Sequence, residues 1–185
     1  MRITALAGGT GAAKFLRGLA ALVEPSTLTV IGNTGDDTEI WGLHISPDLD
    51  TVIYALAGVI DESKGWGVRD DTFRCLQTMA TLGRETWFNL GDRDLATHLF
   101  RTEALREGKT LSEITEAIRK AFGVRFKILP MSDQPVRTRV LTPQGWLNFQ
   151  EFFVREKGRV EVLDVAYEGA ERASYALKLL QSEGE

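Results

Sequence analysis

Four aspartates lie close together in two short polar segments. Asp36 and Asp37 end the segment GNTGDD, and Asp48 and Asp50 lie in SPDLDT. Clustered carboxylates repel one another unless a cation or protons compensate their charge. Carboxylate oxygens are also the ligands that magnesium takes in proteins. We therefore predict that Asp36, Asp37, Asp48 and Asp50 share one magnesium site. The alternatives are an Asx-rich surface turn for the first segment and simple compensation of a helix dipole for the second.

A glycine-rich turn near the N-terminus is typical of a phosphate site. Gly8-Gly9-Thr10-Gly11 follows the apolar run at residues 3–7 and precedes a helical pattern. Glycines let the backbone approach a ligand closely, and the start of a helix offers free N–H groups to an anion. The turn is neither a Walker sequence nor G-x-G-x-x-G. We predict that it contacts a phosphate or a nucleotide, with a tight turn that binds nothing as the alternative.

A tryptophan stands between two glycines in the segment GWGVRDDT. Trp66 in such a loop is poorly placed for core packing, and its indole is suited to stacking on a planar ring. A surface loop that folds back onto the core is the alternative.

The segment GDRDLATH places charged residues where an apolar run gives way to a helical pattern. Arg93 can neutralise phosphate oxygens through the planar fork of its guanidinium. The alternative is that Asp92 only caps the helix and Arg93 only pairs with its acidic neighbours. We expect His98 and His44 to be structural, because their spacing is not that of a metal site.

Apolar periodicity predicts an α/β protein in which these segments meet at one edge of a sheet. Strand, glycine turn, helix and strand over residues 3–31 form a βαβ unit. Ser46-Pro47 and the capping box at residues 110–113 begin two further helices. We also predict helices over residues 70–82, 92–106 and 170–180, and strands over 86–90, 125–129, 136–141, 146–149 and 160–165. The expected fold is a Rossmann-like three-layer domain over residues 1–185, with a mostly parallel sheet and antiparallel strands at one edge.

Composition narrows the class of protein. The chain has 185 residues, enough for one α/β domain with its own core. Its formal net charge of -4 and pI of about 5.4 argue against a general nucleic-acid binder, which carries a basic surface. Cys75 is the single cysteine, so no disulfide can form within the chain, and no window reaches the ~18 apolar residues of a membrane helix. We expect a cytoplasmic protein that binds neither nucleic acid nor membranes.

Together the motifs resemble those of one family, the 2-phospho-L-lactate transferases of coenzyme F-420 biosynthesis. The segments that carry the resemblance follow the family's order and cover nearly the whole chain: GGTGAAKFLRGL, GNTGDD, SPDLDT, GWGVRDDT, WFNLGDRDLATH, LSEIT, KILPMSD and NFQEFFV. Each segment alone is a weak signal, and their combination is specific.

The resemblance implies a magnesium-dependent transfer. A guanosine-diphosphate carrier brings phospholactate or a related three-carbon phospho-acid. The terminal ribityl hydroxyl of 7,8-didemethyl-8-hydroxy-5-deazariboflavin, the deazaflavin precursor, attacks the distal phosphorus, and GMP leaves. Such chemistry needs positioning and charge neutralisation more than a covalent nucleophile. Which phospho-acid is transferred stays open, because the alternatives differ by a few atoms.

The resemblance also implies roles for residues. The expected substrate-binding residues are Gly9, Thr10, Gly11, Asn33, Trp66, Asp92 and Asp94. The expected catalytic residues are Asp37, Asp50 and Arg93. Asp37 and Asp50 are the first choice as metal ligands, with Asp36 and Asp48 in reserve. A homodimer is expected.

Longer members of the family carry a further nucleotide-binding turn, Gly-Pro-Ser-Asn-Pro, which this sequence lacks. We therefore expect residues 1–185 to be the N-terminal portion of a longer fold, with little transfer activity of its own. The rival function is a nucleotide-sugar-binding regulator from a sister group, which shares the glycine turn and the aspartate pair but transfers no phosphate. The SPDLDT and GDRDLATH segments favour the transferase.

Overall fold

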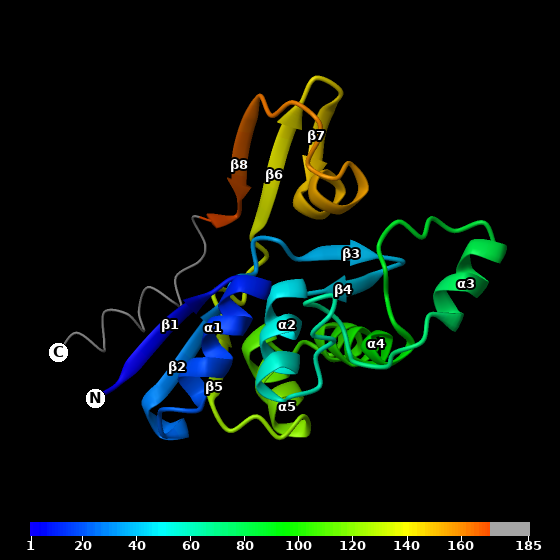
Figure 1. The fold of residues 1–185 in the computed structure, drawn as a ribbon. Coiled ribbons are helices and arrows are strands. Elements are labelled where there is room, and N and C mark those ends of the chain that lie inside the picture. Colours follow the sequence, from blue (N-terminus) through cyan, green and yellow to red (C-terminus); the bar gives the residue numbers. More distant parts are fainter. Residues whose placement is uncertain (171–185) are drawn as a thin grey trace.

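The computed structural model describes residues 1–170 and is built around a three-stranded parallel sheet (Figure 1). Its strands β1 (Ile3–Ala7), β2 (Leu28–Gly32) and β5 (Lys127–Pro130) lie in the order β1-β2-β5. The central strand β2 pairs on both sides, with Val30 opposite Ile128 on β5. The carboxyl ends of β1 and β2 therefore open at the same edge of the sheet, as the sequence predicts.

Two helices begin at this edge. α1 (Thr10–Ala20) leads from β1 toward β2 and completes the predicted βαβ unit. α2 (Pro47–Leu56) begins with a proline, whose fixed φ suits the first helical turn. The two helices pack on one another, and all residues from 49 to 55 of α2 are buried. Because α2 packs within the core, Asp50 in its first turn is buried and Asp48 is half-buried.

Two further helices complete the main core. α4 (Asp92–Arg106) has the predicted bounds, and α5 (Leu111–Ala121) packs against both β5 and α4. The predicted capping box is present, because the Thr110 side chain accepts from the N–H of Glu113 and the Glu113 carboxylate accepts from the N–H of Thr110. Apolar side chains from the sheet, α1, α2 and α5 form one cluster. Its fully buried members include Leu16, Val30, Leu49, Ile53, Ile114 and Ile128.

The helix predicted over residues 70–82 is shorter than expected. α3 comprises only Arg74–Thr81. The carboxylate of Asp92 accepts from the backbone N–H groups of Arg74 and Cys75, at 3.1 Å and 2.9 Å. The N–H groups of the first helical turn have no partner within the helix, and Asp92 supplies one here. A residue distant in sequence therefore fixes where α3 begins, which local pattern could not reveal.

The prediction of a strand over residues 86–90 is wrong. This segment is irregular, and its side chains pack on a hairpin that was not predicted from the sequence. The hairpin joins β3 (Thr38–Ile40) to β4 (Leu43–Ile45) through Trp41 and Gly42. Both turn residues have positive φ, 54° and 77°, as a two-residue turn of type I′ requires.

The late strands form a sheet of their own, and the expectation that they extend an edge of the parallel sheet is wrong. β6 (Arg137–Thr142) pairs antiparallel with both β7 (Gly145–Asn148) and β8 (Asp164–Glu168). Figure 1 shows this sheet standing away from the parallel one. The chain leaves β5 through residues 131–136, and β6 finds its partners only in later strands. The strand predicted over residues 160–165 begins at Asp164 instead.

The α/β class is confirmed by these elements. The helix predicted over residues 170–180 lies outside the described residues except at its first position. In the described part of the chain, no helix is both long and apolar enough to cross a membrane.

Candidate functional site

A cleft of about 480 Å³ lies at the sheet edge where α1 and α2 begin. The glycine turn, the loop after β2, the start of α2, the loop around Trp66, α4 and the segment after β7 all contribute to its walls. One part of the lining is polar and consists of Gly9, Thr10, Asp36, Asp48, Asp50, Asp94 and His98. Another part is aromatic and includes Tyr54, Trp66, Phe88, Phe149 and Phe153.

The glycine turn presents the start of α1 to this cleft. Gly9 is the N-cap of α1, and no side chain caps the helix there. The first N–H groups of a helix have no partner within the helix, so this end suits an anion. The Thr10 hydroxyl donates to the carbonyl of Gly65 at 3.1 Å and ties the Trp66 loop to the turn. Gly65 has a φ of +79°, and a Cβ there would lie 2.7 Å from Thr10 Cγ2.

Asp48 faces the cleft beside the glycine turn. Its Oδ2 accepts from the amide of Asn33 at 2.9 Å, and Asn33 Oδ1 accepts from the N–H of Gly35. Burial raises the pKa of Asp48 to about 6; the Asn33 hydrogen bond opposes the rise, and the charges of Asp36 and Asp37 add to it. Asn33 does not line the cleft but orients a carboxylate that does.

Asp37 lies behind the cleft lining. Its side chain is buried, and Oδ2 accepts from Nε2 of His44 and from Oγ of Ser46, both at 2.9 Å. Oδ1 has no hydrogen-bond partner. The adjacent Asp36 does line the cleft, and its backbone carbonyl accepts from the Gln150 amide at 3.1 Å. Burial raises the pKa of Asp36 above its ordinary value.

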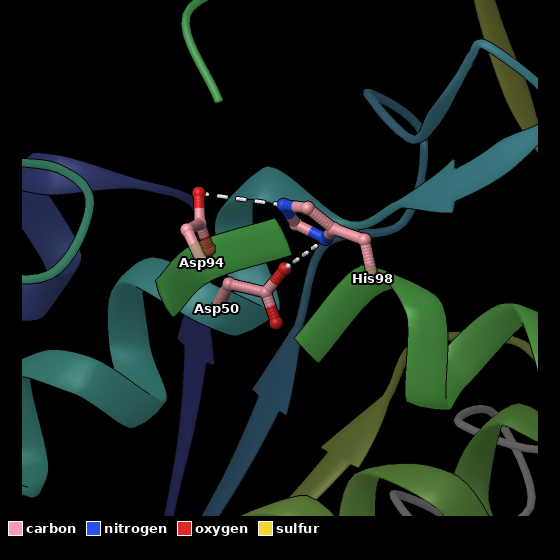
Figure 2. A group of neighbouring side chains, drawn as sticks. All are labelled: Asp50, Asp94 and His98. Atoms are coloured by element: carbon pink, nitrogen blue, oxygen red, sulfur yellow. Dashed lines mark ion pairs between the residues drawn. The ribbon is translucent and has the colours of Figure 1, made fainter. Parts of the chain in front are cut away.

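Asp50 and Asp94 face one histidine from two different helices. Figure 2 shows the His98 ring between the two carboxylates, with Nδ1 3.6 Å from Asp50 Oδ2 and Nε2 3.3 Å from Asp94 Oδ2. The other oxygen of Asp50 pairs with the fully buried guanidinium of Arg101. The other oxygen of Asp94 accepts from the Tyr54 hydroxyl at 2.7 Å. Each carboxylate is thus held by one oxygen and directs the other toward His98.

The two carboxyl groups differ in pKa. Burial raises the pKa of Asp50 above its ordinary value, and the charges of Arg101 and His98 limit the rise. Burial also acts to raise the pKa of Asp94, but His98 and Tyr54 outweigh it, so this pKa lies below its ordinary value. Asp94 is therefore ionised at neutral pH.

Apart from Tyr54 on α2, the aromatic wall comes from three separate segments. Phe149 and Phe153 stack with their centroids 5.6 Å apart and their planes at 9°, and Phe153 is 60% exposed. They flank the start of the turn Glu151–Arg155, a short π-helical segment that follows β7. Trp66 and Phe88 belong to the loops before α3 and before α4. A stacked pair of rings, one exposed and one half-buried, beside charged groups suits a ligand that is planar at one end and anionic at the other.

Besides Asn33 and Asp37, three residues predicted for the site lie outside the cleft lining. Gly11 is exposed within the first turn of α1. Asp92 caps α3, as described above. Arg93 is exposed, and its guanidinium donates to the carbonyl of Arg69 at 3.2 Å. The role predicted for Arg93 in catalysis therefore stays a prediction without a cleft contact to support it.

Several residues that line the cleft were not predicted from the sequence. His98 follows Asp94 by four residues, a spacing that places both on one helical face, so a local signal was available. Tyr54, Phe149 and Phe153 carried no such signal, because an apolar position on a helix or near a strand usually predicts core packing.

Comparison with known proteins identifies the family. The family model described as 2-phospho-L-lactate transferase CofD matches residues 3–182. The chain belongs to this family. It is 46% identical over 177 residues to the 2-phospho-L-lactate transferase of Methanosarcina acetivorans, which covers 96% of this chain and 58% of that protein. It is 44% identical over 189 residues to the phosphoenolpyruvate transferase of Streptomyces griseus, covering 100% of this chain and 59% of that protein.

The chain thus spans about three fifths of the length of the curated relatives it matches. Among solved structures, a protein of the UPF0052 family from Bacillus halodurans is similar with a TM-score of 0.58 and 16% sequence identity. The match covers 91% of this chain and 52% of that one. At this identity the likeness supports the fold alone.

Proposed function

We propose that the protein transfers a phospholactyl, phosphoenolpyruvyl or related phospho-acid group from a guanosine-diphosphate-linked donor to the deazaflavin precursor, with release of GMP. The observation that carries the proposal is the division of one cleft into two unlike walls. Carboxylates and the open start of α1 lie on one wall, and stacked aromatic rings lie on another. Family membership supplies the reaction class.

The polar wall suits the diphosphate of the donor. Free N–H groups at the start of α1 attract phosphate oxygens, and Gly9 lets them approach closely because it has no side chain. The same wall carries Asp36, Asp48 and Asp50, which would repel phosphate unless a cation lies between. We therefore include magnesium in the proposal.

The residues present fit a bound cation. Asp37 Oδ1 and Asp50 Oδ2 are buried oxygens without a hydrogen-bond partner, and an unpaired buried polar atom is unfavourable. Asp37 and Asp50 would hold the ion, with Asp36 and Asp48 beside them. When bound, magnesium would neutralise phosphate charge that develops during the transfer. His44, Ser46 and Arg101 fix the orientation of these carboxylates.

The aromatic wall suits the acceptor. The deazaflavin ring is planar and would stack on Phe149, Phe153 or Trp66, leaving its ribityl chain to extend toward the carboxylates. This orientation would place the terminal hydroxyl near the donor phosphorus. Holding both reactants in one cleft supplies the positioning on which phosphoryl transfer depends.

A direct assay tests the proposal. The protein is incubated with the deazaflavin precursor, a guanosine-diphosphate-linked phospho-acid and magnesium, and products are identified by mass spectrometry. Because the relatives are longer, the assay uses both this chain and a version extended to their full length. We expect the phospho-acid adduct of the precursor together with an equal amount of GMP.

A parallel binding screen distinguishes the transferase from the rival function, a nucleotide-sugar-binding regulator. The deazaflavin precursor, guanosine diphosphate and a uridine-diphosphate sugar are each titrated into the protein by calorimetry. Binding of the first two without the third supports the transferase. Tight binding of the sugar nucleotide alone, with no adduct formed by either version, would contradict it.

A further inference from the structure

Asp71 precedes α3 but caps α4, whereas Asp92 begins α4 but caps α3. This capping exchange consists of the contacts between residues 71–75 and residues 91–94. We propose that Asp71 is a positioning residue for the transfer reaction, because the exchange holds Trp66 in its place on the cleft wall. The inference rests on the proposed function, in which Trp66 is one of the rings that stack on the deazaflavin precursor.

The Asp71 carboxylate binds the start of α4 with both oxygens. Oδ1 and Oδ2 accept from the backbone N–H of Arg93 at 2.9 Å and 3.1 Å, and Oδ2 also accepts from the N–H of Asp94 at 3.0 Å. The first N–H groups of a helix have no partner within it, and a carboxylate there also compensates the helix dipole. Gly91, the N-cap of α4, has no side chain to serve as a cap. Asp71 therefore takes that role from a preceding loop.

Asp92 makes the matching contacts to α3. Besides the N–H groups of Arg74 and Cys75, its carboxylate accepts from the Thr72 hydroxyl at 2.5 Å. Its own N–H donates to the Thr72 carbonyl at 2.8 Å. Hydrogen bonds thus run in both directions across the exchange. Because α4 also packs on β4 and α5, the loop before α3 is fixed to a helix of the main core.

Gly91 provides the space for this exchange. It is buried, and a Cβ there would overlap Oδ2 of Asp71. Its φ of -74° suits residues of any type, so the backbone conformation does not require glycine. The close approach of the Asp71 carboxylate is what excludes a side chain at this position. The segment GDRDLATH therefore carries a packing requirement toward Asp71 that its local pattern does not reveal.

The loop that carries Trp66 is anchored at both ends. At one end, the Thr10 hydroxyl donates to the Gly65 carbonyl at 3.1 Å and joins the loop to the start of α1. At the other end, Asp71 joins it to the start of α4. Both helices begin at the cleft, so Trp66 is held between two fixed points of its wall. Loss of Asp71 would free one anchor and leave the core cluster intact.

The segment between Trp66 and Asp71 needs this anchor because its backbone is strained. Asp70 has a φ of 56°, a conformation uncommon for residues other than glycine. Such a residue persists when its surroundings impose the conformation. The Arg93 guanidinium donates to the Arg69 carbonyl at 3.2 Å, and Asp71 bonds to α4 on the other side of Asp70. Arg93 and the start of α4 thus hold Asp70 through its two neighbours.

Hydrogen exchange tests the anchor without any substrate. Mass spectrometry compares amide exchange in the wild type and in Asp71→Ala. We expect faster exchange at residues 65–73 and 93–95 of the variant, because the bonds that hold them are lost, and unchanged exchange across β1, β2 and α5. Unchanged exchange at residues 65–73 would overturn the proposal, whether or not the protein transfers a phospho-acid.

Steady-state kinetics test the role in the reaction. Asp71→Ala should raise the KM for the deazaflavin precursor about tenfold, the size of one lost stacking contact, and leave the KM for the donor unchanged. The kcat should change little, because a ring that stacks away from the phosphorus binds substrate and transition state equally. Equal rises in both KM values would show a general structural defect and contradict the positioning role. No transfer by the wild type would contradict the proposed function instead, and the exchange result would still decide the anchor.

A double-mutant cycle shows whether Asp71 acts through Trp66. In a Trp66→Ala background, Asp71→Ala should raise the KM for the precursor no further, because the ring that it positions is absent. The same rise in both backgrounds would overturn the proposal.

Two further variants separate the hydrogen bonds from the charge. Gly91→Ala should displace the Asp71 carboxylate and reproduce the KM change, although it removes no acid. Asp70→Asn is the matched control, because it neutralises an exposed neighbour and asparagine tolerates positive φ. It should leave both KM values unchanged, and circular dichroism confirms folding of each variant. If Asp70→Asn raises the KM for the precursor as Asp71→Ala does, charge alone accounts for the effect and the proposal is wrong.

Discussion

A Cβ atom placed on Gly9 would lie 2.7 Å from Oδ1 of Asp48, closer than such atoms approach in folded proteins. The glycine turn and the first turn of α2 are therefore in direct contact because Gly9 has no side chain. Gly8 is also close to the same carboxylate, with its hypothetical Cβ 3.6 Å from Oδ2. The absence of a side chain at Gly9 thus permits the observed position of the Asp48 carboxylate in the cleft.

Gly9→Val should displace Asp48 and obstruct the start of α1. We expect guanosine diphosphate binding by calorimetry to weaken at least about tenfold and transfer to fall on the order of a hundredfold, because a misplacement of ~1 Å has that effect on rate. Gly18→Ala is the control, since its Cβ meets nothing within 4 Å and alanine favours a helix. Unchanged affinity in a folded Gly9→Val protein would show that the turn does not hold the diphosphate.

Asp48→Asn should change stability in a pH-dependent way. The pKa of Asp48 is raised from 3.8 to about 6 in the folded protein, so the folded state retains this proton at pH values where the unfolded state has lost it. The contribution of Asp48 to stability therefore falls as pH rises from about 4 to about 6 and is constant outside that window. Asparagine cannot ionise, so the variant should gain stability relative to the wild type between pH 4 and pH 7.

Urea unfolding of both proteins at pH 4 and pH 7 measures this difference. Asn33 can still donate to the amide oxygen of the new side chain, so the hydrogen bond is preserved as a control. A difference between the two proteins that is the same at both pH values would contradict the assignment.

The Asp50–Arg101 pair should show strong coupling. Both side chains are buried, and removing one partner leaves the other charge uncompensated. We expect Arg101→Gln or Asp50→Asn alone to lower the free energy of unfolding by about 3–5 kcal/mol, and the double variant by less than the sum. Urea denaturation of all four proteins completes the cycle. Additive effects would mean that the pair does not act as a unit.

Phe153→Ala should impair acceptor binding with little effect on stability. Phe153 is 60% exposed and lines the cleft, so part of its ring is free to contact a bound ligand. Loss of one stacking ring, about 1.4 kcal/mol, corresponds to an affinity for the deazaflavin precursor about tenfold weaker. Fluorescence titration measures this change.

Trp146→Ala serves as the matched aromatic control. Trp146 is 44% exposed on β7 but does not line the cleft, so its removal should leave the affinity for the precursor unchanged. Equal losses in both variants would place the acceptor elsewhere.

The sequence by itself determined the features whose cause is local. The glycine turn between β1 and α1, the proline start of α2 and the capping box of α5 follow from residues within a few positions of one another. The family also follows from short ordered motifs, and the chain's match to the family model confirms it. Such features can be predicted from the sequence because they depend on neighbouring residues and not on the rest of the fold.

Only the tertiary structure decided how the four clustered aspartates differ. Asp48 faces the glycine turn, whereas Asp37 pairs with His44 on the β3–β4 hairpin and Asp50 pairs with Arg101 on α4. The hairpin and α4 are distant in sequence from these carboxylates and reach them only through tertiary packing. Since a carboxylate takes its direction and pKa from groups that pack against it, sequence could predict where acids gather but not what each one meets.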